Sequence, residues 1–357
     1  MKIDLIAGAR PNFVKIASLI HSIQQSSSKI DFRLIHTGQH YDEALSGSFF
    51  KQLELPNPDI HLGIGSGSQA EQTAAIMIAY EKVLKKNKPD VCLVVGDVTS
   101  SMACAVTAKK MQVKVAHVEA GLRSSDWSMP EEINRVLIDS ISDYFFTTTK
   151  EASLLLIKSG KSKQQVFFVG NTMIDTLLRF KASFIQPRIW LDQKLREKEY
   201  IMLTLHRPGN VDKADQLKLF LKEIIKNSNA LPIIFPVHPR TAEVLSKFEL
   251  IASNLYLIDP LSYLEFNYMV ERSKVVITDS GGITEETTVM GVPCMTLRDN
   301  TERPETVTLG TNELLGTDPA ALVPAMEKLF KGNWKKGKIP LKWDGKTGKR
   351  IIEILIS

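Results

Sequence analysis

Short hydrophobic runs alternate with amphipathic segments of helical length along almost the whole chain. Two runs, in VCLVVGD and KVVITDS, are continuously hydrophobic, as expected for parallel strands buried on both faces. This alternation is typical of a doubly wound α/β fold. The predicted strands are Ile3–Ala7, Phe32–His36, Val91–Val95, Val113–Val118, Tyr144–Thr148, Tyr200–Leu205, Pro232–Pro236, Leu255–Ile258, Lys274–Thr278 and Cys294–Leu297, and the clearest helices are Pro11–Gln25, Ala70–Lys86 and Gln216–Asn227.

The alternation runs twice, and 357 residues are too many for one average domain, so we expect two Rossmann-like domains. The first series closes at Gly170 and Asn171. A helix starting near Thr172 then leads into a charged connection from Gln186 to Lys198. We therefore predict an N-terminal domain over residues 1–171 and a C-terminal domain over 172–344. A short amphipathic helix over 345–357 is expected to pack back on one of them, the first being favoured.

Composition narrows the classes of function. A net charge of +5 without runs of Lys and Arg interleaved with aromatic residues argues against nucleic acid as a partner. The three cysteines lie in apolar or small-residue surroundings and are interpreted as reduced core residues. No apolar stretch reaches about 18 residues, the length needed for a membrane helix, and the N-terminus is interpreted as a strand. We expect a cytoplasmic protein that has no membrane partner.

Polar residues directly follow several predicted strands. Ligands of open α/β sheets bind at the carboxyl ends of the strands, so these residues are the first candidates for a site. They are Gly8 and Arg10, Asp97 and Glu119 in the first half, and His206 with Arg207, His238 with Arg240, and Asp279 with Ser280-Gly281-Gly282 in the second. Two facing sheet edges would form a central cleft, with carboxylates on one wall and His, Arg and backbone donors on the other.

The segment TDSGGITEE is the strongest candidate for phosphate binding. A strand runs into Ser280-Gly281-Gly282 and then into a helix whose free N–H groups and dipole favour an anion. Glycine also lets the backbone approach a ligand closely. The alternative is an ordinary strand-to-helix turn in which Ser280 caps the helix.

The carboxylates also have structural alternatives. The structural alternative for Asp97 is the N-cap of the helix that follows, and the alternative for Glu119 is an ion pair with Arg123 or Arg135. Glu131 and Glu132 follow Pro130 at a predicted helix start, where the helix dipole favours acids. His117 is expected to satisfy a core hydrogen bond. His36 and His40 lack metal-ligand spacing, so neither a metal ion nor a cofactor is expected.

Ten segments, in order, carry a resemblance that covers nearly the whole chain: GARPNFVKIASL, HTGQHYD, VVGDVTSSMA, HVEAGLRS, PEEINR, GNTMID, TLHRPGN, PVHPR, TDSGGITEE and RDNTERPETV. Together they resemble the non-hydrolysing UDP-N-acetylglucosamine 2-epimerase family. The resemblance implies the two-domain fold of GT-B glycosyltransferases, a UDP-sugar in the cleft and a homodimer. The chain departs from the commonest family pattern at Asn12 and Pro208.

By motif match, the resemblance also implies roles for individual residues. Asp97, Glu119 and Glu131 would be the acid/base set, with His206 assisting at the diphosphate or the leaving oxygen. Substrate binding would involve Arg10, His238, Ser280, Gly281 and Gly282 at the phosphates, Glu286 at the ribose, Phe266 at the uracil face, and Lys15 and Arg303.

The C2 proton of an N-acetylhexosamine is not acidic, so we expect UDP to leave first, giving a 2-acetamidoglucal to which UDP adds back. Carboxylates clustered in a closed cleft would raise one another's pKa, which suits proton transfer near neutral pH. The alternatives are a hydrolysing epimerase, an epimerase of a modified UDP-amino sugar, a GT-B glycosyltransferase and a catalytically silent nucleotide-sugar sensor. The carboxylate-bearing segments favour the epimerase over the last two.

Overall fold

The computed structural model describes residues 1–8, 10–27, 30–38, 49–237, 239–248 and 252–357. The chain forms two compact units, Met1–Arg179 with Leu341–Ser357, and Phe180–Pro340. The first unit extends beyond the predicted boundary at 171 because helix α7 (Thr172–Phe180) is tied to it. Thr176 Oγ1 donates a hydrogen bond to the carbonyl oxygen of Val14, and Ser18 Oγ donates one to Asp175.

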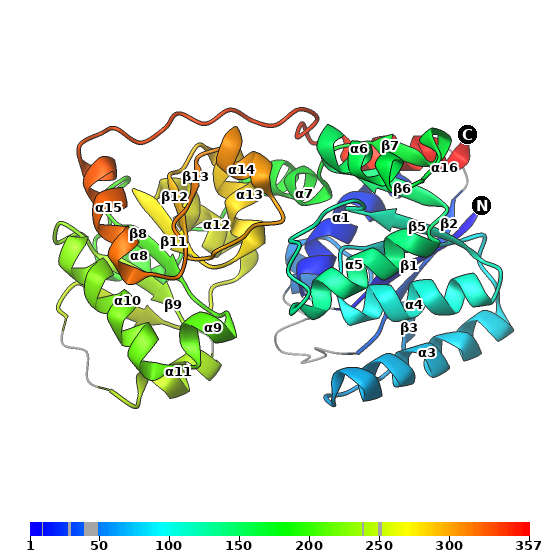
Figure 1. The fold of residues 1–357 in the computed structure, drawn as a ribbon, viewed down its shortest axis with the longest axis horizontal. Coiled ribbons are helices and arrows are strands. Elements are labelled where there is room, and N and C mark those ends of the chain that lie inside the picture. Colours follow the sequence, from blue (N-terminus) through cyan, green and yellow to red (C-terminus); the bar gives the residue numbers. More distant parts are fainter. Residues whose placement is uncertain (9, 28–29, 39–48, 238, 249–251) are drawn as a thin grey trace. The chain divides into compact units, whose positions relative to one another are not determined.

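The first unit is built on a parallel sheet in the order β3-β2-β1-β4-β5-β6-β7 (Figure 1). Its strands are β1 (Lys2–Ala7), β2 (Asp31–His36), β3 (Ile60–His61), β4 (Val91–Val95), β5 (Lys114–Val118), β6 (Tyr144–Thr147) and β7 (Val166–Phe168). Its helices, besides α7, are α1 (Arg10–Gln25), α3 (Gln69–Lys86), α4 (Thr99–Lys110), α5 (Pro130–Ile141), α6 (Lys150–Lys158) and α16 (Thr347–Ile356).

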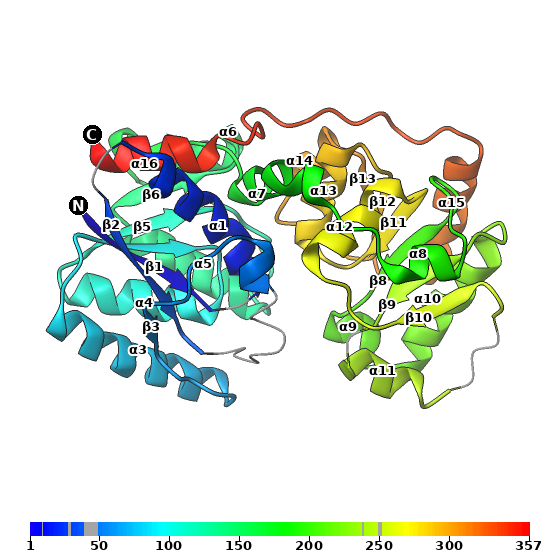
Figure 2. The same cartoon turned by 180° about the vertical axis from the view of Figure 1, so that it is seen from behind.

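Helices cover both faces of this sheet, and the two opposite views agree (Figures 1 and 2). Helices α3, α4 and α5 lie on one face, where a buried cluster joins Ile76 and Tyr80 of α3 to Cys92 and Val94 of β4. Helices α1 and α16 lie on the other face and contact each other. The C-terminal segment is therefore a structural part of the first unit.

The second unit repeats the plan with a parallel sheet in the order β10-β9-β8-β11-β12-β13. Its strands are β8 (Ile201–Thr204), β9 (Ile233–Pro236), β10 (Leu255–Ile258), β11 (Val275–Thr278), β12 (Cys294–Thr296) and β13 (Asn312–Leu314). Its helices are α8 (Arg188–Asp192), α9 (Pro208–Val211), α10 (Ala214–Asn227), α11 (Pro239–Leu245), α12 (Tyr263–Arg272), α13 (Gly281–Met290), α14 (Pro304–Thr308) and α15 (Leu322–Phe330).

Two buried clusters again cover the two faces of the sheet. One joins β8 and β9 to α10, α11 and α15, and the other joins the same strands to α8, α12 and α13. All ten predicted strands and the three predicted helices are confirmed. Strands β3, β7 and β13 were not predicted, because two or three residues are too few to show a hydrophobic pattern.

In each sheet, the order in which the chain adds strands reverses at one point. In the first unit the chain leaves β1 towards β2 and β3, then returns to β4 on the other side of β1. The second unit has the same reversal between β8 and β11. Such a topological switch point is where open α/β sheets bind ligands. No described helix has both the length and the apolar character to cross a membrane.

Candidate active site

Glu119 occupies the end of β5 in a strained backbone conformation. Its φ of 72° lies in the left-handed region, which non-glycine residues rarely adopt. The N–H groups of Glu119 and Ala120 both donate to the carbonyl oxygen of Phe146, which holds this turn in place. The side chain is buried, and its Oε2 lies 2.7 Å from Lys15 Nζ of helix α1.

Glu119 Oε2 pairs with Lys15 of α1, while Arg123 pairs with Asp139 and Arg135 with Asp97. Gly96 lies beside the pair, and a Cβ added there would be 3.5 Å from Lys15 Nζ and 3.6 Å from Glu119 Oε2. Its φ of 65° also favours glycine. Asn12, one turn before Lys15, donates to the Val95 carbonyl oxygen at the end of β4.

Asp97 follows β4 but is not the N-cap of the next helix. Val98 holds the N-cap position of α4, so the capping alternative is wrong. Instead, Asp97 Oδ2 lies 2.6 Å from Arg135 Nη2, and Arg135 Nη1 lies 2.7 Å from Glu132 Oε2. Asn134 Nδ2 donates to the Asp97 carbonyl oxygen. Helix α5 therefore fixes both the backbone and the side chain of Asp97.

The two acids that open α5 lie in the first helical turn, as predicted. Glu132 is buried, and burial alone would raise its pKa. Hydrogen bonds from Ser124, Ser125 and Arg135 outweigh burial and lower the pKa below the usual value. Glu131, the predicted acid/base residue, is half-buried. Glu132 is thus committed to Arg135 and the loop before α5, and its chemistry is that of a structural carboxylate.

A second buried pair supports the turn that carries Asp97. His117 Nδ1 lies 2.7 Å from Asp139 Oδ1, and His117 Nε2 lies 3.0 Å from the Gly96 carbonyl oxygen. Burial would raise the pKa of Asp139, but His117 and Arg123 lower it below the usual value. The predicted core hydrogen bond of His117 is confirmed. The role of Asp139 was missed, because its partners lie on β5 and in the following loop.

In the second unit, His206 follows β8 and Asp279 follows the neighbouring strand β11. His206 Nδ1 lies 2.8 Å from Asp279 Oδ1. Asp279 is fully buried, whereas 54% of the His206 side chain is exposed. Burial would raise the pKa of Asp279, but hydrogen bonds from His206, the Arg207 N–H and Asn210 lower it. The sequence identified Asp279 as a strand-end residue but not as the partner of His206.

The Ser280-Gly281-Gly282 turn leads from β11 into α13. Ser280 holds the N-cap position, but its side chain makes no capping hydrogen bond to the helix. A Cβ added at Gly281 would lie 2.7 Å from Glu302 Oε1, and Glu302 pairs with Arg298 at 2.7 Å. A side chain at this position would displace the Glu302 carboxylate from Arg298. The turn has the geometry of an anion site at a helix N-terminus.

Further along α13, Glu286 is buried and accepts a hydrogen bond of 2.9 Å from the Tyr263 hydroxyl. Burial raises the pKa of Glu286 to about 7, although the hydrogen bonds from Tyr263 and Asn267 oppose this rise. Phe266, on α12, is half-buried against the cluster that covers this face of the sheet. Arg303 is buried, and its Nε lies 2.8 Å from Glu285 Oε1, so its guanidinium already has an acidic partner.

Two predicted substrate-binding residues have no described side chain. Arg10 is the first residue of α1, and the structure describes its backbone but not its side chain. His238 lies outside the described residues. Within the described part of the chain, no group of three or more His, Cys, Asp and Glu residues is arranged to hold a metal ion.

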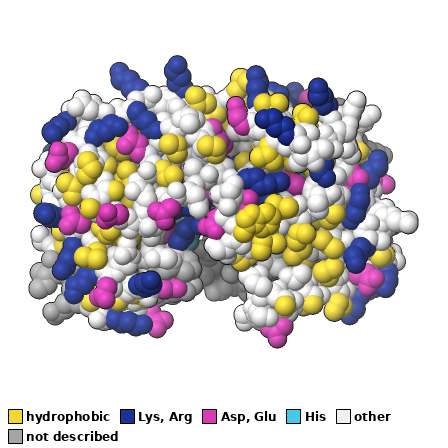
Figure 3. Space-filling view, in the orientation of Figure 1, with side chains coloured by type: hydrophobic (Ala, Val, Ile, Leu, Met, Phe, Trp, Pro, Cys, Tyr) yellow, Lys and Arg dark blue, Asp and Glu magenta, His cyan; other side chains and the backbone are white. Residues whose placement is uncertain are grey.

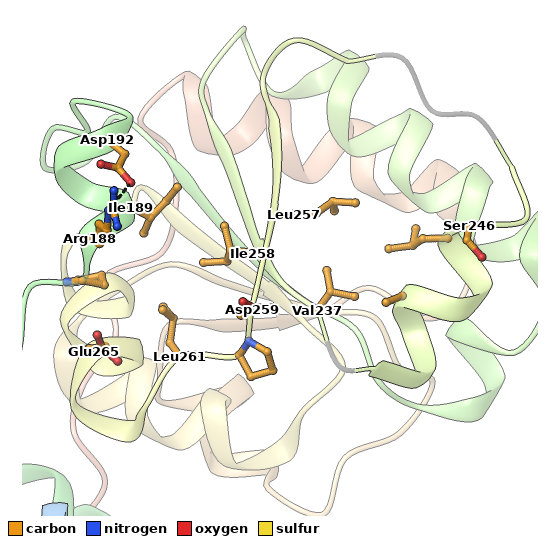
Figure 4. Close-up of a pocket in the computed structure, with 14 residues that line it drawn as sticks. Arg188, Ile189, Asp192, Val237, Ser246, Leu257, Ile258, Asp259, Leu261 and Glu265 are labelled. Atoms are coloured by element: carbon orange, nitrogen blue, oxygen red, sulfur yellow. Dashed lines mark ion pairs between the residues drawn. The ribbon is translucent and has the colours of Figure 1, made fainter. Parts of the chain in front are cut away.

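A separate cavity of about 880 Å³ opens over β10 at the edge of the second sheet (Figure 4). Ile189 of α8, Val237, Leu257 and Leu261 form much of its apolar wall, and Arg188 pairs with Asp192 at its rim. Among the residues that the structure describes, the lining includes none of the predicted catalytic or phosphate-binding residues. This cavity is therefore distinct from the Ser280 turn and from the His206–Asp279 pair.

Comparison with known proteins decides the family. Residues 22–356 match the family model described as UDP-N-acetylglucosamine 2-epimerase. The chain belongs to this epimerase family. A UDP-N-acetylglucosamine 2-epimerase from Methanocaldococcus jannaschii is 43% identical, with 99% of each chain covered. A UDP-2,3-diacetamido-2,3-dideoxy-D-glucuronate 2-epimerase from Pseudomonas aeruginosa is 38% identical, again with 99% of each covered.

Solved structures agree with the epimerase family assignment. The crystal structure of the M. jannaschii epimerase in complex with UDP-GlcNAc and UDP has a TM-score of 0.89 at 42% identity, covering 100% of this chain and 99% of that one. A lipopolysaccharide outer core galactosyltransferase matches with a TM-score of 0.57 at 14% identity and shares the fold alone. The predicted pair of Rossmann-like domains of the GT-B type is thereby confirmed for this member of the 2-epimerase family.

Proposed function

We propose that this epimerase interconverts UDP-N-acetylglucosamine and UDP-N-acetylmannosamine without hydrolysing either. The observation that carries the proposal is the set of carboxylates held at the strand ends of the first unit. Arg135 orients the Asp97 carboxylate, and Lys15 orients the Glu119 carboxylate. A site that only bound a nucleotide sugar would have no use for acid/base groups so placed.

The reaction we propose is an elimination followed by a re-addition. A carboxylate removes the C2 proton as the C1–O bond to UDP breaks, and the bonding electron pair leaves with the phosphate oxygen. The products of this half are 2-acetamidoglucal and UDP. In the second half the phosphate oxygen attacks C1, and an acid delivers a proton to the opposite face of C2. Both halves need a dry site that retains the glycal.

The residue roles follow the same proposal. Asp97, Glu119 and Glu131 supply the acid/base groups, and Lys15 orients Glu119. His206 assists the departing phosphate oxygen. Substrate contacts are assigned to Arg10, His238, Ser280, Gly281 and Gly282 at the diphosphate, Glu286 at the ribose, Phe266 at the uracil and Arg303 near the phosphates. The chemistry requires the carboxylates of the first unit and the turn of the second to act on one substrate molecule.

We also propose that the protein acts in the cytoplasm as a homodimer. The first unit exposes the large apolar side chains of Ile78, Trp127, Ile133 and Leu137. Figure 3 shows a hydrophobic patch on the face of this unit that carries α5. Exposed apolar patches of this kind often mark protein interfaces. Sedimentation velocity would show a dimer for the native protein and a shift to monomer for Ile133→Glu combined with Leu137→Glu.

Proton NMR of the protein with UDP-N-acetylglucosamine in D2O tests the proposed reaction. We expect UDP-N-acetylmannosamine carrying deuterium at C2, and its loss by at least about 100-fold in Asp97→Asn, since general acid/base groups contribute at this level. Asp215→Asn, at an exposed position on α10, is the matched control and should retain activity.

Three other outcomes would change the proposal. Free N-acetylmannosamine with stoichiometric UDP would indicate a hydrolysing epimerase. Transfer of the sugar to an acceptor would indicate a glycosyltransferase. If the protein shows no deuterium exchange at C2 and releases no UDP, this substrate is refuted. The next substrate to test is then a UDP-diacetamido uronate, which the name of the P. aeruginosa relative specifies.

A further inference from the structure

Asp279 contacts the ring of His206, and the role of this contact in catalysis rests on the proposed function. The two residues lie at the ends of β8 and β11, which pair in parallel with Thr204 opposite Thr278. This is the strand pair on either side of the switch point of the second sheet. Two residues that are 73 positions apart in sequence are thereby held at hydrogen-bond distance by the sheet itself.

The Asp279 carboxylate accepts hydrogen bonds from three N–H groups and lies against His206 Nδ1. Oδ2 accepts the Arg207 N–H at 2.9 Å, the His206 N–H at 3.1 Å and Asn210 Nδ2 at 3.1 Å. Oδ1 faces His206 Nδ1 at 2.8 Å and the His206 N–H at 3.2 Å. Burial would raise the pKa of Asp279, but hydrogen bonds from His206, the Arg207 N–H and Asn210 lower it, so the side chain is a carboxylate near neutral pH.

The protonation of the His206 ring follows from the same geometry. Because the carboxylate can only accept, Nδ1 must carry a hydrogen in both the neutral and the charged imidazole. Nε2 is the ring atom left to meet a ligand, on a side chain that is half-exposed at the end of β8. The ring orientation and the tautomer are thus both set by Asp279.

We propose that Asp279 is a positioning residue that holds His206 with Nδ1 protonated, so that Nε2 faces the departing phosphate oxygen. When the C1–O bond breaks and its electron pair moves to that oxygen, a hydrogen on Nε2 bonds to the new negative charge. The same hydrogen bond weakens when the oxygen attacks C1 again. His206 therefore keeps its proton over the full cycle, and the negative charge of Asp279 stabilises the charged ring.

Asp279→Asn is the variant that tests this role. The amide oxygen is expected to turn towards the three donors at Oδ2, which leaves the amide NH2 facing His206 Nδ1. Nδ1 must then accept, so the ring keeps a hydrogen on Nε2 alone, stays neutral and cannot place a positive charge beside the departing phosphate oxygen. For an assisting histidine we expect a loss of about 10²–10³-fold in kcat with KM little changed.

Asn210→Ala is the matched control, because Asn210 donates to Asp279 and to the Leu297 carbonyl oxygen but does not contact the ring. It perturbs the same buried cluster and should lower stability while keeping kcat within a few-fold. If Asp279 acts through His206, the double variant Asp279→Asn with His206→Gln should be no slower than His206→Gln alone. Losses that multiply would overturn the proposal.

Long-range ¹H–¹⁵N NMR of the full-length protein, with the His206 signals assigned from the His206→Gln spectrum, reads the tautomer without any turnover. A hydrogen on Nδ1 in the native protein and none on Nδ1 in Asp279→Asn would support the proposal, and the same state of Nδ1 in both would overturn it. An inactive native protein that still shows the tautomer change would refute the proposed function instead. Full activity of His206→Gln would remove the catalytic role of His206 and with it the role of Asp279.

Discussion

Glu286 offers a prediction that links stability to binding. Its carboxyl group is buried beside Tyr263, and burial raises its pKa from 4.5 to about 7. Between these two values the folded protein holds a proton that the unfolded chain has released. The free energy of unfolding must therefore fall as pH rises through this window, and the loss is complete above about pH 7.

The size of the effect follows from the pKa. A rise from 4.5 to about 7 corresponds to about 3 kcal/mol lost between pH 4 and pH 8. Glu286→Gln removes the titration and keeps an acceptor for the Tyr263 hydroxyl. The variant should therefore gain stability relative to the native protein as pH rises, by up to about 3 kcal/mol. For a unit of this size that is about 6–12 °C in Tm.

Calorimetry of the full-length native protein and Glu286→Gln at pH 5, 6, 7 and 8 measures this difference. Tyr263→Phe is a useful second variant, since loss of the hydroxyl removes a hydrogen bond that lowers the pKa of Glu286 and should move the window to higher pH. A Tm difference between native protein and Glu286→Gln that stays constant from pH 5 to 8 would refute the reasoning.

The same substitution should weaken UDP binding if the carboxylate holds the ribose hydroxyls. Hydrogen bonds to charged groups contribute about 1.5–3 kcal/mol, so calorimetric titration should show an affinity about 10–100-fold lower at pH 8. Glu286 would then be a position where stability is given up for binding. Unchanged UDP affinity in a more stable Glu286→Gln would separate the two effects and remove the ribose role.

Two further predictions concern the first unit. Lys15→Met leaves the buried Glu119 carboxylate without its described cation. Urea unfolding should show a free energy of unfolding lower by about 3–5 kcal/mol, and most of the epimerase activity should be lost. An equally stable variant would show that the ion pair does not hold this turn. Asp175→Ala removes the acceptor for the Gly348 N–H at the start of α16 and should cost about 1–3 kcal/mol. Faster amide hydrogen exchange confined to α16 and α1 is expected, and unchanged exchange there would contradict the role of Asp175.

The sequence by itself determined the fold class, because hydrophobic periodicity is a local property that every strand and helix carries in its own residues. It also placed Asp97, Glu119, His206 and Asp279 directly after strands. The parallel α/β pattern then brings such residues to the carboxyl edge of a sheet without further information. The motif resemblance added the family and the reaction expected of it, which the comparisons bear out as a family assignment.

Only the tertiary structure decided which side chains meet. Lys15 and Glu119 are 104 positions apart, and His206 and Asp279 are 73 apart, so no local pattern could pair them. The strand orders that put β1 beside β4 and β8 beside β11 are equally non-local. Hydrophobic runs predict that a strand is buried, but they do not predict which strand lies next to it. That choice depends on how the helices cover both faces, and it is what turns separate strand-end residues into pairs.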